Sequence, residues 1–189
     1  MRRRSFLKTV ATVVPAAGLQ GFLASEMRAE PNASTTSPTL HVVGAGDDRF
    51  GQHHSMGVST LLFKVGAAET DGRLFVIEHQ HLVPGGPALH LHLSQEEWFC
   101  VMEGEVAFQV GDQRLHLRAG ESILAPRRVP HTFSSVSATP SRMLIAFCPA
   151  GQMEQYFRDG EAAGAHAGDA DFMRRYGMER VGPSPFWKT

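Results

Sequence analysis

The run Leu89-His90-Leu91-His92-Leu93 constrains this chain more than any other stretch, because leucine and histidine alternate strictly along it. A period of two is typical of a β-strand and argues against an amphipathic helix. On an extended strand the two imidazoles project from the same face. The run therefore predicts a strand that presents two metal-ligating histidines side by side.

A carboxylate follows this run at Glu97, five residues after His92. On one unbroken strand an odd offset would place it on the opposite face, so we expect the chain to turn near residues 94–95. A returning strand over residues 98–102 would complete a hairpin and carry the carboxylate back to the histidines. Two imidazoles and a carboxylate form a divalent-metal site of mixed nitrogen and oxygen type.

The stretch from Gly85 to Gly104 resembles the first motif of the cupin superfamily: a glycine-rich turn, His-x-His, a glutamate and, after six more residues, a glycine. This spacing selects Glu97 over Glu96 as the ligand. Gly120, Pro126 and His131 match the second motif of the family, in which Arg128 stands where a glycine is usual. The resemblance implies one divalent transition metal (Fe, Mn, Ni, Cu or Zn), held by His90, His92, Glu97 and His131.

Short strand-like runs separated by Gly and Pro turns fill residues 40–150, which predicts a sandwich or a barrel. The resemblance selects an all-β fold, the cupin jelly-roll β-barrel. After residue 150 the pattern changes to two sets of apolar residues at i, i+3 and i+4, namely Met153, Tyr156 and Phe157, then Phe172, Met173 and Tyr176. We expect a short helical C-terminal tail over residues 151–189, with two helices joined by a flexible segment at residues 160–168. The tail would cover the barrel or a homodimer interface.

The amino terminus carries the run Arg3-Arg4-Ser5-Phe6-Leu7-Lys8, which is typical of a twin-arginine export signal. The apolar stretch that follows, residues 10–24, is short and interrupted by Pro and Gly, which suits a signal peptide better than a membrane span. We expect a signal peptide at residues 1–29, a linker at residues 30–39 and a periplasmic protein free of the membrane after cleavage. An uncleaved anchor is the alternative.

Several side chains share strand faces with the expected ligands. Phe99 and Val101 alternate with Glu97, and Phe133 alternates with His131, so they are candidate walls of an apolar substrate pocket. The alternative is that these side chains are simply core. No Arg or Lys shares a strand face with the expected ligands, which argues against a small dianion such as oxalate as substrate.

Other histidines and the two cysteines leave alternatives open. His79 and His81 form a second His-x-His without a free carboxylate downstream, which favours a solvated or pocket-lining strand face over a second metal site. Cys100 and Cys148 lie on strands that are expected to be neighbours, so either a disulfide or two free thiols is compatible with the sequence.

The charge of the chain excludes one class of partner. A net charge of −1 and an isoelectric point of about 6.8 give no basic surplus that would indicate binding to nucleic acid. The segment at residues 176–183 resembles the tail of small cupins grouped with quercetin dioxygenases. That resemblance implies a dioxygenase that uses dioxygen on a small, largely apolar or aromatic substrate of enol or catechol type.

Under this interpretation Glu97 alternates between metal ligand and general base, because a dry pocket raises the basicity of a carboxylate. The sequence leaves two alternatives open. One is a non-redox isomerase or decarboxylase that uses the metal as a Lewis acid. The other is a periplasmic protein that binds a metal or small ligand without catalysis.

Overall fold

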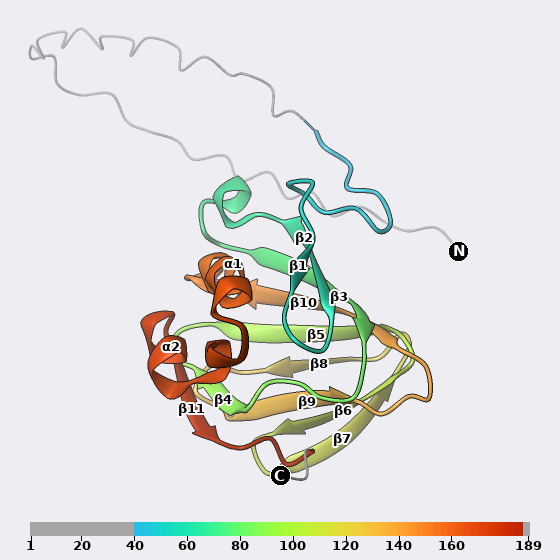
Figure 1. Ribbon diagram of the computed structural model, residues 1–189, viewed down its shortest axis with the longest axis vertical. Coiled ribbons are helices and arrows are strands. Elements are labelled where there is room, and N and C mark those ends of the chain that lie inside the picture. The colour runs from blue at the N-terminus through green and yellow to red at the C-terminus, as the bar shows by residue number, and fades with distance from the viewer. Residues whose placement is uncertain (1–39, 187–189) are drawn as a thin grey trace, which may run out of the picture. The chain divides into compact units, whose positions relative to one another are not determined.

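Two antiparallel β-sheets face each other in the computed structural model, which describes residues 40–186 (Figure 1). The six-stranded sheet consists, in spatial order, of β1 (His54–Ser55), β2 (Thr60–Val65), β3 (Phe75–Leu82), β10 (Ser141–Cys148), β5 (Glu96–Glu103) and β8 (Ser122–Ala125). The five-stranded sheet consists of β11 (Met178–Gly182), β4 (Leu89–His92), β9 (His131–Ser135), β6 (Glu105–Val110) and β7 (Gln113–Arg118). The all-β jelly-roll predicted from the sequence is therefore confirmed.

The core lies between the two sheets because each long strand buries alternate residues. Along β10, Met143, Ile145 and Phe147 are each at most 1% exposed, while the residues between them are half-buried. Such an alternation directs one face of the strand inward. Rings of phenylalanine from both sheets fill this interior, and several of them meet at angles typical of edge-to-face packing.

The prediction of a hairpin between residues 89 and 102 is wrong. β4 belongs to the five-stranded sheet, where it pairs with β9 and β11, whereas β5 belongs to the six-stranded sheet, where it pairs with β10 and β8. The chain does turn after His92, but the turn leads to the facing sheet, and its residues Leu93 and Ser94 are exposed. A turn predicted from local sequence does not reveal whether the next strand pairs with the last one.

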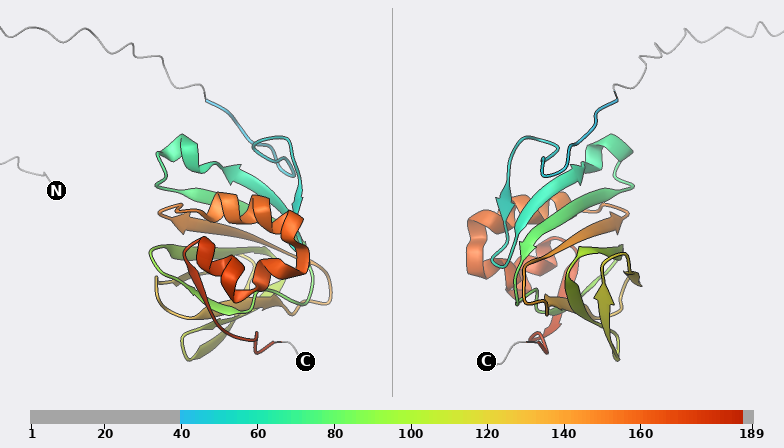
Figure 2. Two further views of the ribbon diagram at one scale, coloured as in Figure 1. Left: turned by 60° about the vertical axis from the view of Figure 1, so that its left-hand side comes forward. Right: turned by 90° about the vertical axis from the view of Figure 1, so that its right-hand side faces the viewer.

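The C-terminal segment folds back onto one side of the barrel. It comprises α1 (Met153–Ala163), the 3-10 turn η2 (Gly164–Gly168), α2 (Ala170–Arg175) and then β11. Figure 2 shows α1 and α2 together on the same side of the sheets. The apolar stripes predicted for these helices are buried except at Tyr176, which is half-buried, and Tyr156 packs against Phe172 with ring centroids 5.7 Å apart. A further 3-10 turn, η1 (Ala67–Thr70), joins β2 to β3.

Two details of the tail differ from expectation. Gly160 lies inside α1 and η2 continues from that helix, so residues 160–168 form a helical turn and not a flexible joint. The tail also ends in a strand, β11, which pairs with β4 at the edge of the five-stranded sheet. Its role as a cover of the barrel is confirmed, while homodimer formation stays a prediction.

Three residues of the family motifs adopt the backbone that the motifs require. Gly104 turns the chain between β5 and β6 with φ 79°, in the left-handed region that favours glycine. At Gly86 a β-carbon would lie 2.0 Å from the carbonyl oxygen of Phe133, so only glycine fits there. Arg128, at the position where the family usually has glycine, also adopts a left-handed conformation with φ 63°.

The two cysteines are free. β5 and β10 are neighbours, as expected, but Cys100 pairs with Leu144, and Cys148 lies four residues farther along its strand. Four residues of strand span about 13 Å, whereas a disulfide needs α-carbons within about 7 Å. The signal peptide predicted for residues 1–29 and the linker predicted for residues 30–39 lie outside the described residues. Within residues 40–186, no helix is both long and apolar enough to cross a membrane.

Candidate metal centre and its cavity

Four side chains predicted as ligands converge in the interior of the barrel. His90, His92, Glu97 and His131 each offer one ligand atom, and these atoms all lie within 4.8 Å of one another. The histidines come from the adjacent strands β4 and β9, in which His90 lies directly opposite His131. Glu97 reaches the cluster from β5 in the facing sheet. The site therefore bridges the two sheets, and all four side chains are buried.

Backbone carbonyls orient two of the imidazoles. Nδ1–H of His90 donates to the carbonyl oxygen of Ala88 at 2.9 Å, and Nδ1–H of His131 donates to that of Val129 at 2.9 Å. A carbonyl only accepts hydrogen bonds, so each Nδ1 must carry the proton. Each Nε2 is then the nitrogen available to a metal ion, as in most histidine ligands whose other nitrogen is held by the protein.

The imidazole of His92 lacks hydrogen-bond partners in this cluster. It is 1% exposed, and neither ring nitrogen makes a hydrogen bond within the described residues. Its Nε2 lies 2.9 Å from Oε2 of Glu97, but the angle does not suit a hydrogen bond. Buried polar atoms are rarely left without a partner. The four side chains therefore fit a divalent transition metal, for which imidazole and carboxylate together are suitable ligands.

Electrostatic coupling within the cluster changes the protonation of its members. Burial alone would raise the pKa of the Glu97 carboxyl, but the imidazoles of His131 and His92 outweigh burial and hold that pKa well below its usual range. Burial lowers the pKa of His131, yet Glu97, 2.8 Å from Nε2, raises it by more. Burial and the two neighbouring imidazoles lower the pKa of His90 to about 3. The expectation that the pocket raises the basicity of Glu97 is therefore wrong.

A cavity of about 500 Å³ adjoins the cluster. His90, His92 and Glu97 form part of its wall, and the C-terminal helices close it with Met153, Tyr156, Phe157 and Met173. Its volume falls in the range of small-molecule sites, and its wall is mainly apolar, which is typical of such sites. The tail that covers the barrel thus supplies part of the cavity wall.

The three predicted pocket residues have different positions. Phe133 lines the cavity, whereas Phe99 and Val101 do not. The ring of Phe99 packs against those of Phe108 and Phe133, with centroids 5.1 and 5.7 Å apart, and Val101 is fully buried in the same core. Both continue the inward face of β5 beyond Glu97, away from the cavity. For these two residues the interpretation as core is confirmed.

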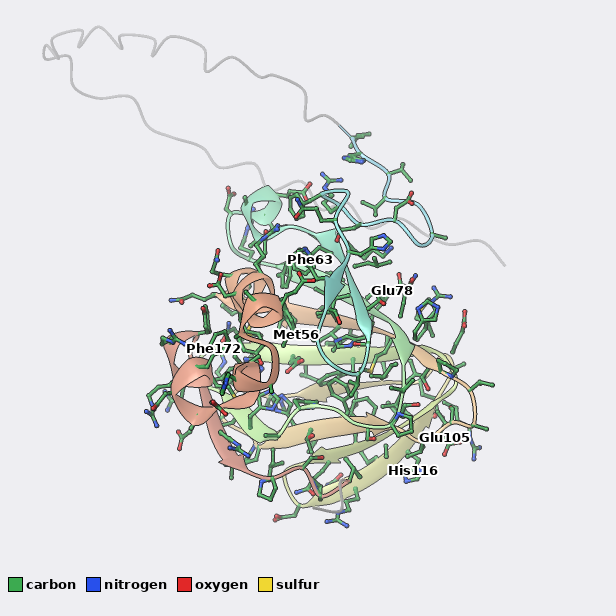
Figure 3. All side chains as sticks on the ribbon, viewed as in Figure 1. Met56, Phe63, Glu78, Glu105, His116 and Phe172 are labelled. Carbon is green, nitrogen blue, oxygen red and sulfur yellow. The ribbon has the colours of Figure 1, made fainter. Side chains whose placement is uncertain are left out.

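Sequence reasoning missed several cavity residues because they come from distant segments. Met56 and Val58 belong to the connection between β1 and β2, and Figure 3 shows Met56 beside α1. Arg180 lies on β11 and also lines the cavity. The prediction that no Arg or Lys shares a strand face with the ligands is therefore wrong, because β11 pairs with β4 and places Arg180 opposite His90. The alternation of Met178 and Arg180 was the available signal, and it is weak.

The two histidines of the second His-x-His, His79 and His81, have different surroundings. His79 is 5% exposed and lines the cavity, whereas His81 is exposed and has a φ of 53°. The left-handed backbone at His81 ends the regular alternation of β3. His79 thus lines the pocket and His81 is solvated, which are the two environments predicted for this strand face.

The fold is a cupin jelly-roll, and its interior contains a buried histidine and glutamate cluster able to bind a metal ion. A family model described as the cupin domain matches residues 78–147. This stretch runs from β3 to the penultimate residue of β10 and contains all four cluster residues. Residues 78–147 thus match the cupin domain family, and residues 40–186 have the corresponding jelly-roll fold.

Curated relatives match only part of this chain. A stretch of 54 residues is 39% identical to the HTH-type transcriptional regulator PuuR of Escherichia coli and covers 29% of each chain. A stretch of 70 residues is 26% identical to the uncharacterized protein MJ1618 of Methanocaldococcus jannaschii and covers 36% of this chain and 56% of that one. The chain thus spans less than two thirds of the relatives that it matches.

Solved structures support the fold alone. An RmlC-like cupin from Shewanella frigidimarina superposes with a TM-score of 0.50 at 18% identity, over 61% of this chain and 96% of that one. At such identity the likeness extends to the barrel and not to the reaction.

Proposed function

We propose that this protein is a metal-dependent dioxygenase that acts on a small, largely apolar or aromatic substrate with an enol or catechol oxygen. The observation that supports it best is the buried cluster of three histidines and Glu97 at the wall of a mainly apolar cavity of about 500 Å³. The resemblance of residues 176–183 to the tail of quercetinase-like cupins adds a second, weaker support.

The four cluster residues would hold the metal, which when bound supplies a Lewis acid and a redox link between substrate and dioxygen. Nε2 of His90 and Nε2 of His131 are oriented by the carbonyls of Ala88 and Val129. Glu97 contributes a negative charge that offsets that of the metal. The apolar side chains of α1 and α2 exclude water around the substrate, which strengthens the electrostatic interactions within the site.

Oxygen uptake tests this function. The purified protein is reconstituted separately with Fe(II), Mn(II), Ni(II), Cu(II) and Zn(II), and each form is offered flavonols, catechols and β-diketones. We expect uptake with at least one redox-active metal and none with zinc, which has no redox chemistry. If no substrate is turned over with any metal, the proposal is replaced by a protein that binds a metal or small ligand without catalysis.

A second candidate function is a non-redox isomerase or decarboxylase that acts on a carboxylic acid. It is favoured by Arg180, whose cation lies at a cavity that contains a metal-binding cluster. An arginine is suited to a carboxylate because its guanidinium offers paired donors. Product formation with the zinc form, without oxygen uptake, would favour this function over the first.

A further inference from the structure

His79 is a buried histidine of the cavity wall that takes no part in the metal cluster. It lies on β3 in the six-stranded sheet, where Phe75, Ile77 and His79 alternate on the inward face. Its side chain borders the same cavity as His90 and Glu97, although it comes from a strand that makes no ladder with β4 or β5. His79 therefore borders the cavity on a strand other than those that carry His90 and Glu97.

Two contacts hold the ring of His79. Its Nδ1 lies 2.7 Å from Oγ of Ser59, and both side chains are at least nine-tenths buried. The ring also meets Phe133 edge to face, with centroids 5.7 Å apart and planes at 84°. A buried imidazole held by a hydrogen bond and a ring contact has little rotational freedom, so its second nitrogen has a defined direction.

Nε2 of His79 has no hydrogen-bond partner within residues 40–186, whereas Nδ1 is satisfied. The neighbouring parts of the cavity wall include Val58, Phe133 and Ile145, none of which offers a polar side-chain atom. Unlike the ring nitrogens of His92, Nε2 of His79 is not fully buried, so a molecule in the cavity can reach it and form a hydrogen bond with it. The side chains of the wall around His79 are thus apolar, and Nε2 of the imidazole is the polar atom that this part of the wall offers to a bound molecule.

We infer that Nε2 of His79 forms a hydrogen bond with a hydroxyl or carbonyl oxygen of the substrate and so positions it in the cavity. The inference rests on the proposed function, in that the substrate is the small, oxygen-bearing molecule of the same cavity. Under this inference the substrate carries two oxygen atoms, one that points to Nε2 of His79 and one that points to the metal cluster.

The chemistry of the ring limits which oxygen suits it. Burial lowers the pKa of His79 to about 4, with a smaller opposing effect of Glu97, so the imidazole is neutral at pH 7. A neutral ring offers either a donor or an acceptor at Nε2, according to which way the proton of Ser59 points. It therefore suits an uncharged hydroxyl or carbonyl group better than a carboxylate.

Binding of simple aromatic probes tests the inference without turnover. The zinc-loaded protein is titrated by calorimetry with phenol, which carries one hydroxyl, and with toluene, which carries none. We expect the wild type to prefer phenol. In His79→Asn the amide still reaches Ser59, but no atom remains at the place of Nε2, so phenol should bind about five- to tenfold more weakly and toluene unchanged. His79→Gln, whose amide reaches farther, should restore part of the phenol affinity.

The controls separate positioning from structural roles and from the proposed reaction. Metal content and melting temperature of both variants should match the wild type; a loss of metal like that of a cluster variant would overturn the inference. So would an unchanged phenol preference in a folded His79→Asn protein, or no phenol preference in the wild type. Failure of the oxygen-uptake screen would reject the dioxygenase while leaving this binding result intact.

Discussion

Arg180 stands directly opposite His90 in the antiparallel pair formed by β11 and β4. Residues opposite each other in such a pair project from the same face, with β-carbons about 5 Å apart. The arginine is exposed and the histidine is buried, yet both line the cavity. The last strand of the barrel therefore places a cation at the rim of the cavity, next to a metal-ligand candidate.

This relationship predicts that Arg180 favours ligands with a negative charge. In the zinc-loaded protein, Arg180→Gln should weaken benzoate binding about two- to fivefold, as expected for an exposed ion pair, and leave benzamide binding unchanged. Calorimetry at low ionic strength measures both ligands. Arg174→Gln is the matched control, because Arg174 pairs with Asp171 on α2 and does not line the cavity. Equal losses for benzoate and benzamide would assign Arg180 a role other than charge recognition.

Removal of cluster histidines should release the metal. Each imidazole supplies a substantial share of the binding free energy, so His92→Ala or His131→Ala should weaken metal retention by at least about 2 kcal/mol. The double variant should be purified nearly metal-free, as measured by elemental analysis. His116→Ala, which alters an exposed histidine on β7, controls for non-specific binding. Full occupancy of the double variant would end the assignment of these ligands.

Glu97→Gln separates metal binding from proton transfer. Because the pKa of Glu97 is held low, the carboxylate is a weak base, and we expect metal content and oxygen uptake to fall in parallel. Glu96→Gln is the internal control, since the side chain of Glu96 points outward and pairs with Arg127. Nη2 of Arg127 lies 2.7 Å from Oε2 of Glu96. If uptake per bound metal instead falls by about a hundredfold, Glu97 also acts as the general base.

Export by the twin-arginine route is a proposal that concerns residues outside the described part of the chain. Arg3→Lys combined with Arg4→Lys keeps the charge but removes the paired arginines, so the protein should accumulate in the cytoplasm. Immunoblots of periplasmic and cytoplasmic fractions measure the distribution. Arg2→Lys, just outside the motif, should leave it unchanged. Undiminished periplasmic protein in the double variant would reject the signal.

Glu78 predicts a pH-dependent contribution to stability. Burial alone would raise its pKa, but hydrogen bonds from Gln80, Lys64 and Arg142 lower it below the ordinary 4.5. A carboxyl with a lowered folded pKa stabilises the protein above its unfolded pKa, and this stabilisation disappears as the pH falls through the folded value. Glu78→Gln (Figure 3) should therefore cost about 2 kcal/mol at pH 7, and the difference from the wild type should shrink below pH 4.5.

The control for Glu78 is a second carboxylate that pairs with the same arginine, Arg142. Glu103 also pairs with Arg142, but its side chain is 58% exposed. Glu103→Gln should cost less than about 1 kcal/mol, because water screens exposed pairs. Urea denaturation at pH 7 and at pH 3.5 measures both variants. Equal costs for the two substitutions would contradict the role assigned to burial.

The ligand set could be predicted from sequence because its signals are local. The alternation of leucine with His90 and His92 specifies a strand and a face, and both are properties of a few adjacent residues. The spacing to Glu97 and Gly104 follows from the length of one strand and from the left-handed turn that ends it. The resemblance to two short motifs then implied His131. In the structure these four side chains do converge.

Other properties depend on which strands meet, and no local pattern carries that information. Glu97 arrives from the facing sheet because β5 pairs with β10, and Arg180 reaches His90 because the last strand closes onto β4. The pKa of Glu97 falls because two imidazoles outweigh burial, a balance that depends on distances across the barrel. Strand pairing between residues far apart in sequence is selected by the packing of the whole core, so only the tertiary structure decided what surrounds the ligands.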